Sequence, residues 1–167
     1  MKTSSALVPT GIHATAVIFR EAGILIRGPS GSGKSSLAIV LMELARAQRC
    51  FGALVGDDRV LVWPRSGRLE ARCGANIEGL IERRGIGIYR TDYAASAMIH
   101  VVVDLYPRGQ ELARTAGCEV RIAEIGGIAL PHLTLGGAAS RLEQAYAVTE
   151  ELDRIGFGQA RPIANFA

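Results

Sequence analysis

A glycine-rich segment that lies between an apolar run and an amphipathic run limits the possible folds more than any other feature. Residues 28–35 read GPSGSGKS and match the pattern G-x-x-x-x-G-K-[ST]. Alternating and β-branched residues predict strands over 12–19 and 23–27, and apolar residues at helical spacing predict a helix over 36–48. The segment therefore joins a strand to a helix, an arrangement in which backbone N–H groups can face an anion.

The residue types of this segment predict a site for nucleotide phosphates. Its glycines let the backbone turn towards the phosphates, Lys34 can reach the β- and γ-phosphates, and the Ser35 hydroxyl can bind Mg²⁺. Lysine is rare in this chain, since Lys34 is one of only two lysines among 19 lysines and arginines. We predict that ATP binds, together with Mg²⁺, at Gly28, Pro29, Ser30, Gly31, Ser32, Gly33, Lys34 and Ser35.

Two adjacent aspartates form the second candidate element. Asp57 and Asp58 follow the apolar residues 53–55, which predict a strand. An aspartate at a strand end could hold Mg²⁺ opposite Ser35, or it could accept the proton of an attacking hydroxyl. The alternative is a solvated turn, where acidic pairs usually lie. The nearby phosphate-binding motif favours a functional role.

Other candidates carry weaker signals when each is taken alone. His13 lies in the first predicted strand, where a lone histidine is more often structural. Glu82 and Arg84 lie beside glycines that permit close approach of a ligand, although a solvated charge cluster fits nearly as well. Arg114 lies in a polar loop and could stabilise a transferring phosphoryl group.

The balance of elements indicates the fold class. A chain of 167 residues has the size of one domain. Seven to nine short predicted strands against two or three helices favour an α/β fold, with a mixed sheet and one phosphate-binding helix. We expect a strand pair over 53–55 and 59–63, a short helix over 74–84 and an amphipathic helix over 138–155. The predicted division is a lead-in over 1–10, a catalytic domain over 11–157 and a tail over 158–167.

Composition excludes several classes of protein. With 49% hydrophobic residues the body is not disordered, and no stretch of 18 residues is apolar enough to predict a membrane span. The apolar start is broken at Pro9, too early for a signal peptide. The cysteines at 50, 73 and 118 fit neither a disulfide framework nor a zinc site, so we expect reduced thiols and a cytoplasmic protein. The net charge is +3, but the basic residues are scattered, which argues against nucleic-acid binding.

Four motifs, in this order and spacing, resemble the catalytic domain of the HPr kinase/phosphorylase family. They are IHA around His13, GPSGSGKSS from Gly28, GDDRV over 56–60 and IERRGIGIY over 81–89. The resemblance covers about residues 11–157. It implies a fold similar to phosphoenolpyruvate carboxykinase, and transfer of the ATP γ-phosphoryl group to a serine of the phosphocarrier protein HPr. It also implies a role in regulating the phosphotransferase system, and a homo-oligomer, a hexamer.

The same resemblance implies roles for individual residues. Ser35 and Glu82 become Mg²⁺ ligands, and the pair Asp57–Asp58 deprotonates the substrate serine, without a choice between the two. His13 matches the active-site histidine, Arg84 lies in the signature loop, and Arg114 matches an arginine near the transferred group.

Departures from the family pattern limit what the resemblance implies. The catalytic part begins by His13, so the chain is similar to a short form of the family found in some α-proteobacteria. The family's phosphorolysis segment typically reads P-V-K-x-G-R-N, whereas residues 129–141 read ALPHLTLGGAASR without lysine, which argues against phosphorylase activity. Two alternatives stay open: a kinase of small molecules, and a nucleotide-sensing module that transfers nothing. The intact acidic residues argue against the sensor.

Overall fold

The structure, a computed structural model, describes residues 8–107 and 121–158. Its helices are α1 (Lys34–Ala47) and α2 (Arg141–Leu152), and α2 continues into a π-helical turn, Asp153–Phe157. The described strands are β1 (Thr10–Phe19), β2 (Ala22–Arg27), β3 (Gly52–Gly56), β4 (Arg59–Arg65), β5 (Arg68–Cys73), β6 (Leu80–Arg83), β7 (Gly87–Arg90), β8 (Ser96–Leu105), β9 (Arg121–Ile125) and β10 (Ile128–Leu135).

Five strands of the main sheet close into a ring. Neighbouring strands follow the order β2, β1, β4, β5 and β8, and β8 pairs in turn with β2. β8 is parallel to β2 and to β10, whereas β1–β2, β1–β4, β4–β5 and β5–β8 are antiparallel pairs. The predicted mixed α/β sheet is confirmed, and its closed part is a small barrel that β10 and β9 extend.

Apolar side chains form two clusters, one on each face of the ring strands. The cluster inside the ring contains small and β-branched residues, which suit a narrow interior: Ala14, Ala16, Val60, Val62 and Ala71 are among them. The outer cluster packs Val17 and Phe19 of β1 against residues of α1 and α2, including Leu37, Leu41, Val148 and Leu152. Along β1, even-numbered residues therefore point into the ring and odd-numbered residues face the helices.

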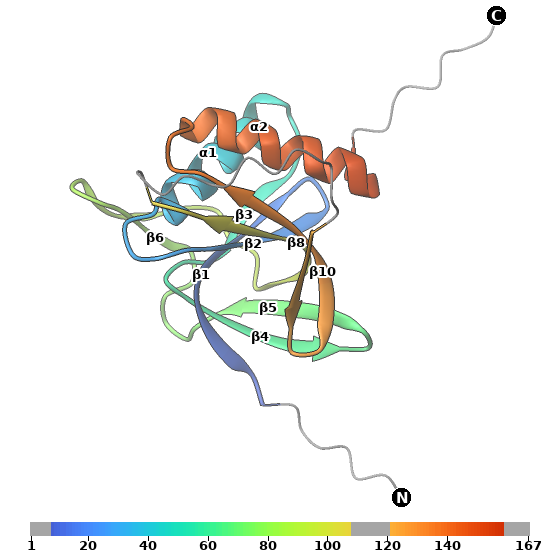
Figure 1. The fold of residues 1–167 in the computed structure, drawn as a ribbon. Helices are drawn as coiled ribbons and strands as arrows, with labels where there is room; N and C mark the ends of the chain where they lie inside the picture. Colours follow the sequence, from blue (N-terminus) through green and yellow to red (C-terminus); the bar gives the residue numbers. More distant parts are fainter. Residues whose placement is uncertain (1–7, 108–120, 159–167) are drawn as a thin grey trace, which may run out of the picture.

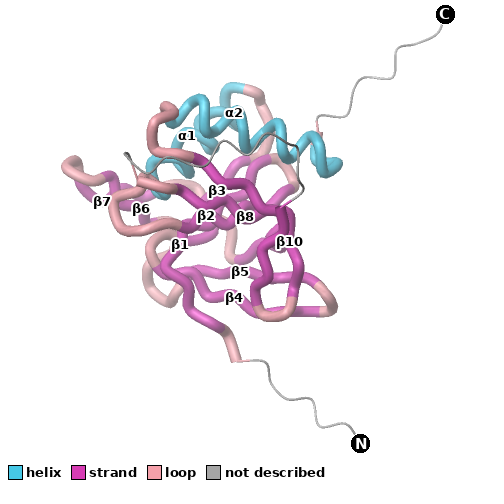
Figure 2. The backbone as a smooth tube through the Cα atoms, in the orientation of Figure 1, coloured by secondary structure: helices cyan, strands magenta, loops and turns pink. Residues whose placement is uncertain are grey.

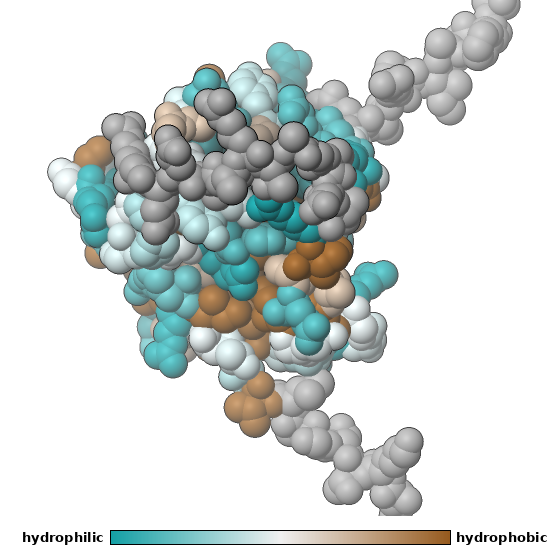
Figure 3. All heavy atoms as spheres, viewed as in Figure 1, coloured by the Kyte–Doolittle hydropathy of each residue, from teal (hydrophilic) through white to brown (hydrophobic). Residues whose placement is uncertain are grey.

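Both helices lie on the same side of the sheet, and β4 and β5 lie away from them (Figures 1 and 2). The β6–β7 hairpin forms a separate two-stranded sheet that projects from one side of the molecule (Figure 2). On the face seen in Figure 3, hydrophilic residues predominate, and apolar residues gather over β5 and β10. None of the described helices has the length and apolar character of a membrane span.

Two expectations for the secondary structure are wrong. Residues 74–84 contain no helix; turns lead into β6, because Asn76 and Gly79 adopt positive φ values that a helix cannot contain. The strands β3 and β4 do not pair with each other as expected. Instead they follow one another along β1, Gly56 opposite Ala16 and Arg59 opposite His13, with the two aspartates between them. The sequence pattern showed the interruption but not the shared partner strand.

We expect the stability of the fold to fall below about pH 6.5 because of His100. Its Nδ1 accepts a hydrogen bond from the Gly23 N–H at 3.0 Å, and its ring packs against Phe157. Burial, aided by the charge of Arg68, lowers the pKa of His100 from the ordinary 6.5. The unfolded chain therefore binds a proton at His100 more readily than the folded chain does. The stability due to neutral His100 is lost as the pH falls from about 6.5 through the lower pKa of the folded state.

Thermal denaturation of wild type and His100→Asn between pH 5 and 8 checks this expectation. Asparagine keeps an acceptor for Gly23 but does not titrate, so the difference in melting temperature between the two proteins should narrow as the pH falls. A difference that stays constant over this range would contradict the assignment.

Candidate active site

The glycine-rich segment forms a loop between β2 and α1 whose backbone is arranged for an anion. Gly31 and Gly33 have φ values of 81° and 96°, a region that favours glycine. The Ser32 N–H donates to the Pro29 carbonyl at 3.0 Å, which folds the loop back on itself. No side chain of the described residues caps α1, and its first turn has no acidic residue. The first N–H groups of the helix are therefore available to phosphate.

Lys34 lies inside this loop. Its Nζ donates to the carbonyl oxygens of Gly28 and Pro29, at 3.0 and 3.2 Å, and contacts His13 Nε2 at 3.0 Å. Burial lowers the pKa of Lys34 from its ordinary value of 10.5, although Asp57 and Asp58 act in the opposite direction. The ammonium group is thus held at the loop by three contacts that a phosphate could replace.

β1 presents one residue to each of the two aspartates. His13 and Thr15 are two positions apart on the face of β1 that looks towards the helices, and the aspartates lie opposite them between β3 and β4. Thr15 contacts Asp57, and His13 contacts Asp58. Asp58 has a φ of 64°, which locally reverses the chain and separates the two carboxylates. The register of β1 therefore gives each aspartate its own partner.

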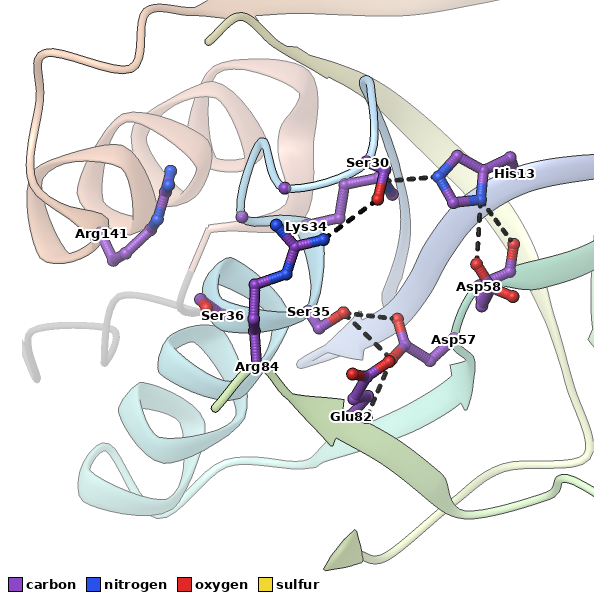
Figure 4. Close-up of a pocket in the computed structure, with 12 residues that line it drawn as sticks. His13, Ser30, Lys34, Ser35, Ser36, Asp57, Asp58, Glu82, Arg84 and Arg141 are labelled. Carbon is purple, nitrogen blue, oxygen red and sulfur yellow. Dashed lines mark hydrogen bonds and ion pairs between the residues drawn. The ribbon is translucent and has the colours of Figure 1, made fainter. Parts of the chain in front are cut away.

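Asp57 is the buried member of the pair, with 7% exposure. Its Oδ1 accepts from the Thr15 hydroxyl at 2.6 Å. The same oxygen accepts from the Ser35 hydroxyl at 2.8 Å (Figure 4). Its Oδ2 accepts from the backbone N–H of Glu82 at 3.2 Å. Three donors thus fix the carboxylate next to the serine of the phosphate loop.

Asp58 is the exposed member, with 82% of its side chain accessible. Its Oδ1 lies 3.0 Å from His13 Nδ1, and its backbone carbonyl lies 3.2 Å from the same nitrogen. An ammonium group has no acceptor, so Lys34 must donate to Nε2, and the hydrogen of neutral His13 is then on Nδ1. His13 consequently donates to Asp58 and orients a carboxylate that is open to a partner.

A cavity of about 230 Å³ joins these groups (Figure 4). Its lining residues come from the phosphate loop, β1, the β3–β4 junction, the β6–β7 hairpin and α2: His13, Ser30, Gly31, Gly33, Lys34, Ser35, Ser36, Asp57, Asp58, Glu82, Arg84 and Arg141. Asp58 and His13 stand at one end, and Arg141 and Ser36 stand at the other (Figure 4). Three cationic side chains, those of Lys34, Arg84 and Arg141, face one cavity, as a polyphosphate requires.

The two arginines contact the phosphate loop directly. Arg84 Nη2 donates to Ser30 Oγ at 3.2 Å, and Arg141 Nη2 donates to the Ser32 carbonyl at 2.9 Å. A Cβ atom at Gly33 would lie 2.1 Å from Arg141 Nη2. The guanidinium can therefore pack against the loop only because residue 33 has no side chain. Arg141 is the first residue of α2, whose start is fixed by the capping box of Ser140 and Glu143.

A charged cluster anchors the strand that precedes the loop. Arg27 makes two hydrogen bonds, of 2.7 and 2.8 Å, to Asp104 of β8, and His132 of β10 contacts the same carboxylate at 2.8 Å. Burial acts to raise the pKa of Asp104, but Arg27 and His132 outweigh it and lower the pKa. This cluster ties β2, β8 and β10 together immediately before Gly28.

Most predicted site residues converge on the cavity. His13, the phosphate loop, Asp57, Asp58, Glu82 and Arg84 are brought together from four separate segments. Arg114 lies outside the described residues. Sequence reasoning missed Thr15 and gave Arg141 no role, because a threonine in a strand and one arginine among many carry no distinctive signal.

Comparisons with known proteins show the family of the chain. The profile of the HPr Serine kinase C-terminal domain matches residues 6–141. The chain belongs to this family. HPr kinase/phosphorylase of Chlorobium phaeobacteroides is 31% identical in an alignment of length 134 that covers 74% of this chain and 39% of that protein. The Streptococcus pneumoniae protein of the same name is 28% identical in an alignment of length 165 that covers 91% of this chain and 51% of that protein.

The fold of this family member is also that of a solved structure. The structure of the Hpr(Ser) kinase/phosphatase from Coxiella burnetii matches with a TM-score of 0.74 at 22% identity, covering 87% of this chain and 98% of that one. The chain spans about half or less of the length of the two curated relatives.

The predicted Mg²⁺ ligands Ser35 and Glu82 both line the cavity, so the residues present fit this ion. The Ser35 hydroxyl and the Asp57 carboxylate touch each other at the cavity, and Glu82 lines the same space. No group of three or more His, Cys, Asp or Glu residues that could hold a metal occurs among the described residues. This is consistent with Mg²⁺, because phosphates and water usually complete its coordination shell and only one or two protein carboxylates are needed.

Proposed function

We propose that this chain is a serine protein kinase that transfers the γ-phosphoryl group of ATP to the phosphocarrier protein HPr. The observation that carries the proposal is the exposed Asp58 carboxylate, which shares one cavity with the phosphate loop. A protein serine can reach an exposed carboxylate, whereas a buried one is out of reach. A module that only senses nucleotide has no use for an open base beside the phosphates.

In the proposed mechanism the two aspartates have different roles. Asp57 accepts three hydrogen bonds and lies beside Ser35, so it holds Mg²⁺ together with Ser35 and Glu82. Asp58 carries one oriented contact from His13 and is otherwise open, so it accepts the proton of the attacking serine. When bound, Mg²⁺ supplies charge neutralisation to the phosphate oxygens.

The cations of the cavity neutralise the remaining charge of the transferring group. Lys34 exchanges its contacts with two loop carbonyls for phosphate oxygens, and Arg84 and Arg141 approach from the two sides of the loop. Fixed positive groups around the equatorial oxygens are the main contribution of a protein to phosphoryl transfer. Arg141 is also the cation that the lysine-free segment 129–141 brings to the cavity.

The experiment that tests the proposal mixes the purified protein with Mg-ATP and HPr and searches for phosphoserine by mass spectrometry. We expect one phosphoserine on HPr, and none when that serine is replaced by alanine. Addition of inorganic phosphate to the phosphorylated HPr then tests the reverse reaction. ATP binding without modification of HPr would contradict the proposal and would favour a small-molecule kinase or a nucleotide sensor.

The assembly and location of the protein stay predictions. We propose a homo-oligomer, a hexamer by resemblance, and a cytoplasmic location. The projecting β6–β7 hairpin, with Ile86 and Ile88 exposed by 62% and 70%, supports the proposal of an assembly surface. Light scattering combined with size-exclusion chromatography would measure the mass of the assembly directly.

A further inference from the structure

Thr15 is a fully buried polar residue next to the cavity that no part of the proposed mechanism uses. It lies in β1 between Ala14 and Ala16, and all three are 0% exposed. Its hydroxyl donates to Asp57 Oδ1 at 2.6 Å. A buried hydroxyl that serves only packing is unfavourable, since valine would fill a similar space without loss of hydration. The hydroxyl therefore serves the contact with Asp57 and not packing alone.

The three hydrogen-bond donors to Asp57 differ in whether they belong to the nucleotide-binding loop or to the strands around it. Ser35 belongs to the phosphate loop, and in the proposed function its hydroxyl would be a ligand of Mg²⁺, so its hydrogen bond to Asp57 would not depend on the fold alone. Thr15 and the Glu82 N–H belong to β1 and β6, so they can hold the carboxylate with or without ligand. The Thr15 contact is the shorter of these two, at 2.6 Å against 3.2 Å.

We infer that Thr15 is a positioning residue that holds Asp57 in the orientation needed for Mg²⁺. This inference rests on the proposed function and adds to it. Thr15 donates to one carboxylate oxygen and the Glu82 N–H to the other, so together they fix the plane of the carboxylate. Because Thr15 does not contact the phosphate loop's backbone in any described hydrogen bond, its effect is on Mg²⁺ and not on nucleotide as such.

The variant Thr15→Val tests the inference, because it keeps the shape of the side chain and removes the donor. Binding of a fluorescent ADP analogue is measured in EDTA and across a Mg²⁺ titration. We expect affinity in EDTA to stay within about twofold of wild type, and the Mg²⁺ concentration for half-maximal enhancement to rise about tenfold or more. Thr15→Ser keeps the hydroxyl and should restore the wild-type Mg²⁺ response.

Thr149→Val is the matched control, since Thr149 is a buried threonine of α2 whose hydroxyl donates to the Tyr146 carbonyl away from the cavity. Thr149→Val removes a buried hydroxyl, as Thr15→Val does, but it should leave the Mg²⁺ response of nucleotide binding unchanged. Nucleotide binding in EDTA shows that each variant is folded, so a Mg²⁺ defect cannot arise from unfolding.

Two results would overturn the inference. One is a wild-type Mg²⁺ response in Thr15→Val, and the other is a Thr15→Ser protein as defective as Thr15→Val. If Thr15→Val no longer binds nucleotide in EDTA, Thr15→Ala is measured in the same way and decides between these outcomes. Failure of the proposed function is distinguishable, because wild type would then leave HPr unmodified in the phosphoserine assay, whereas the Mg²⁺ response of nucleotide binding in wild type and Thr15→Val could still be compared.

Discussion

Asp58→Asn should lower kcat for phosphorylation of HPr by about two to four orders of magnitude, the usual contribution of a general base. Asparagine has nearly the same shape and keeps an oxygen for His13, but it cannot accept the serine proton. The KM for Mg-ATP should change by no more than about twofold, because within the described residues the side chain of Asp58 contacts His13 and makes no hydrogen bond to the phosphate loop. Steady-state kinetics with Mg-ATP as the varied substrate, at saturating HPr, measures both constants.

Asp57→Asn is the matched variant for this prediction. It alters the carboxylate that contacts Ser35 and Thr15, so its principal defect should be a raised Mg²⁺ requirement. The two neighbouring substitutions thus separate the roles of the acidic pair. If Asp58→Asn retained the wild-type kcat while Asp57→Asn lost transfer at saturating Mg²⁺, Asp57 would be the base and the assignment would be reversed.

Lys34→Met should lower kcat/KM for ATP by about two to three orders of magnitude, the usual loss when one group that stabilises transition-state charge is removed. Methionine fills the space of the lysine stem without the ammonium group, which contacts Gly28, Pro29 and His13. The fold should not suffer, because the substitution removes a buried charge whose pKa burial already lowers. Transfer of labelled γ-phosphate to HPr, together with a melting curve, measures both effects.

Lys34→Arg is the control that separates charge from geometry. Its guanidinium keeps the positive charge but is broad and planar, so it should not fit the pocket that Lys34 occupies at 6% exposure. We expect Lys34→Arg to be nearly as inactive as Lys34→Met. Recovery of most activity in Lys34→Arg would mean that general electrostatic attraction, and not the contacts of Nζ within the loop, is what the reaction needs.

The sequence predicted those parts of the site whose chemistry is local. Residues 28–35 form a loop between a strand and a helix because the glycines and the flanking periodicity act over a few residues. The strand over 12–19 and the C-terminal helix were predicted for the same reason and are confirmed as β1 and α2. The four motifs that resemble the HPr kinase family also sufficed for the family assignment.

The division of roles within the acidic pair could not be predicted, because it depends on strand register. Asp57 and Asp58 are chemically identical in the sequence, and they differ only because β1 places Thr15 beside one and His13 beside the other. The ring of strands was equally hidden, since β2 and β8 pair across more than 70 residues of chain, as in Ile24 opposite Val101. Such long-range pairing leaves no trace in a local pattern.

The closed ring of strands has a consequence for how the site can move. His13 and Thr15 are carried by β1, which is paired on both sides, to β2 on one side and to β3 and β4 on the other. A strand with neighbours on both edges cannot detach without opening the barrel, so local unfolding of this wall of the site has nearly the free energy of global unfolding. The aspartates and their β1 partners therefore form a fixed frame. Adjustment to nucleotide and to a protein substrate falls to the phosphate loop and to the exposed turn of the β6–β7 hairpin at residues 84–86, since β6 itself is tied to Asp57 through the Glu82 N–H.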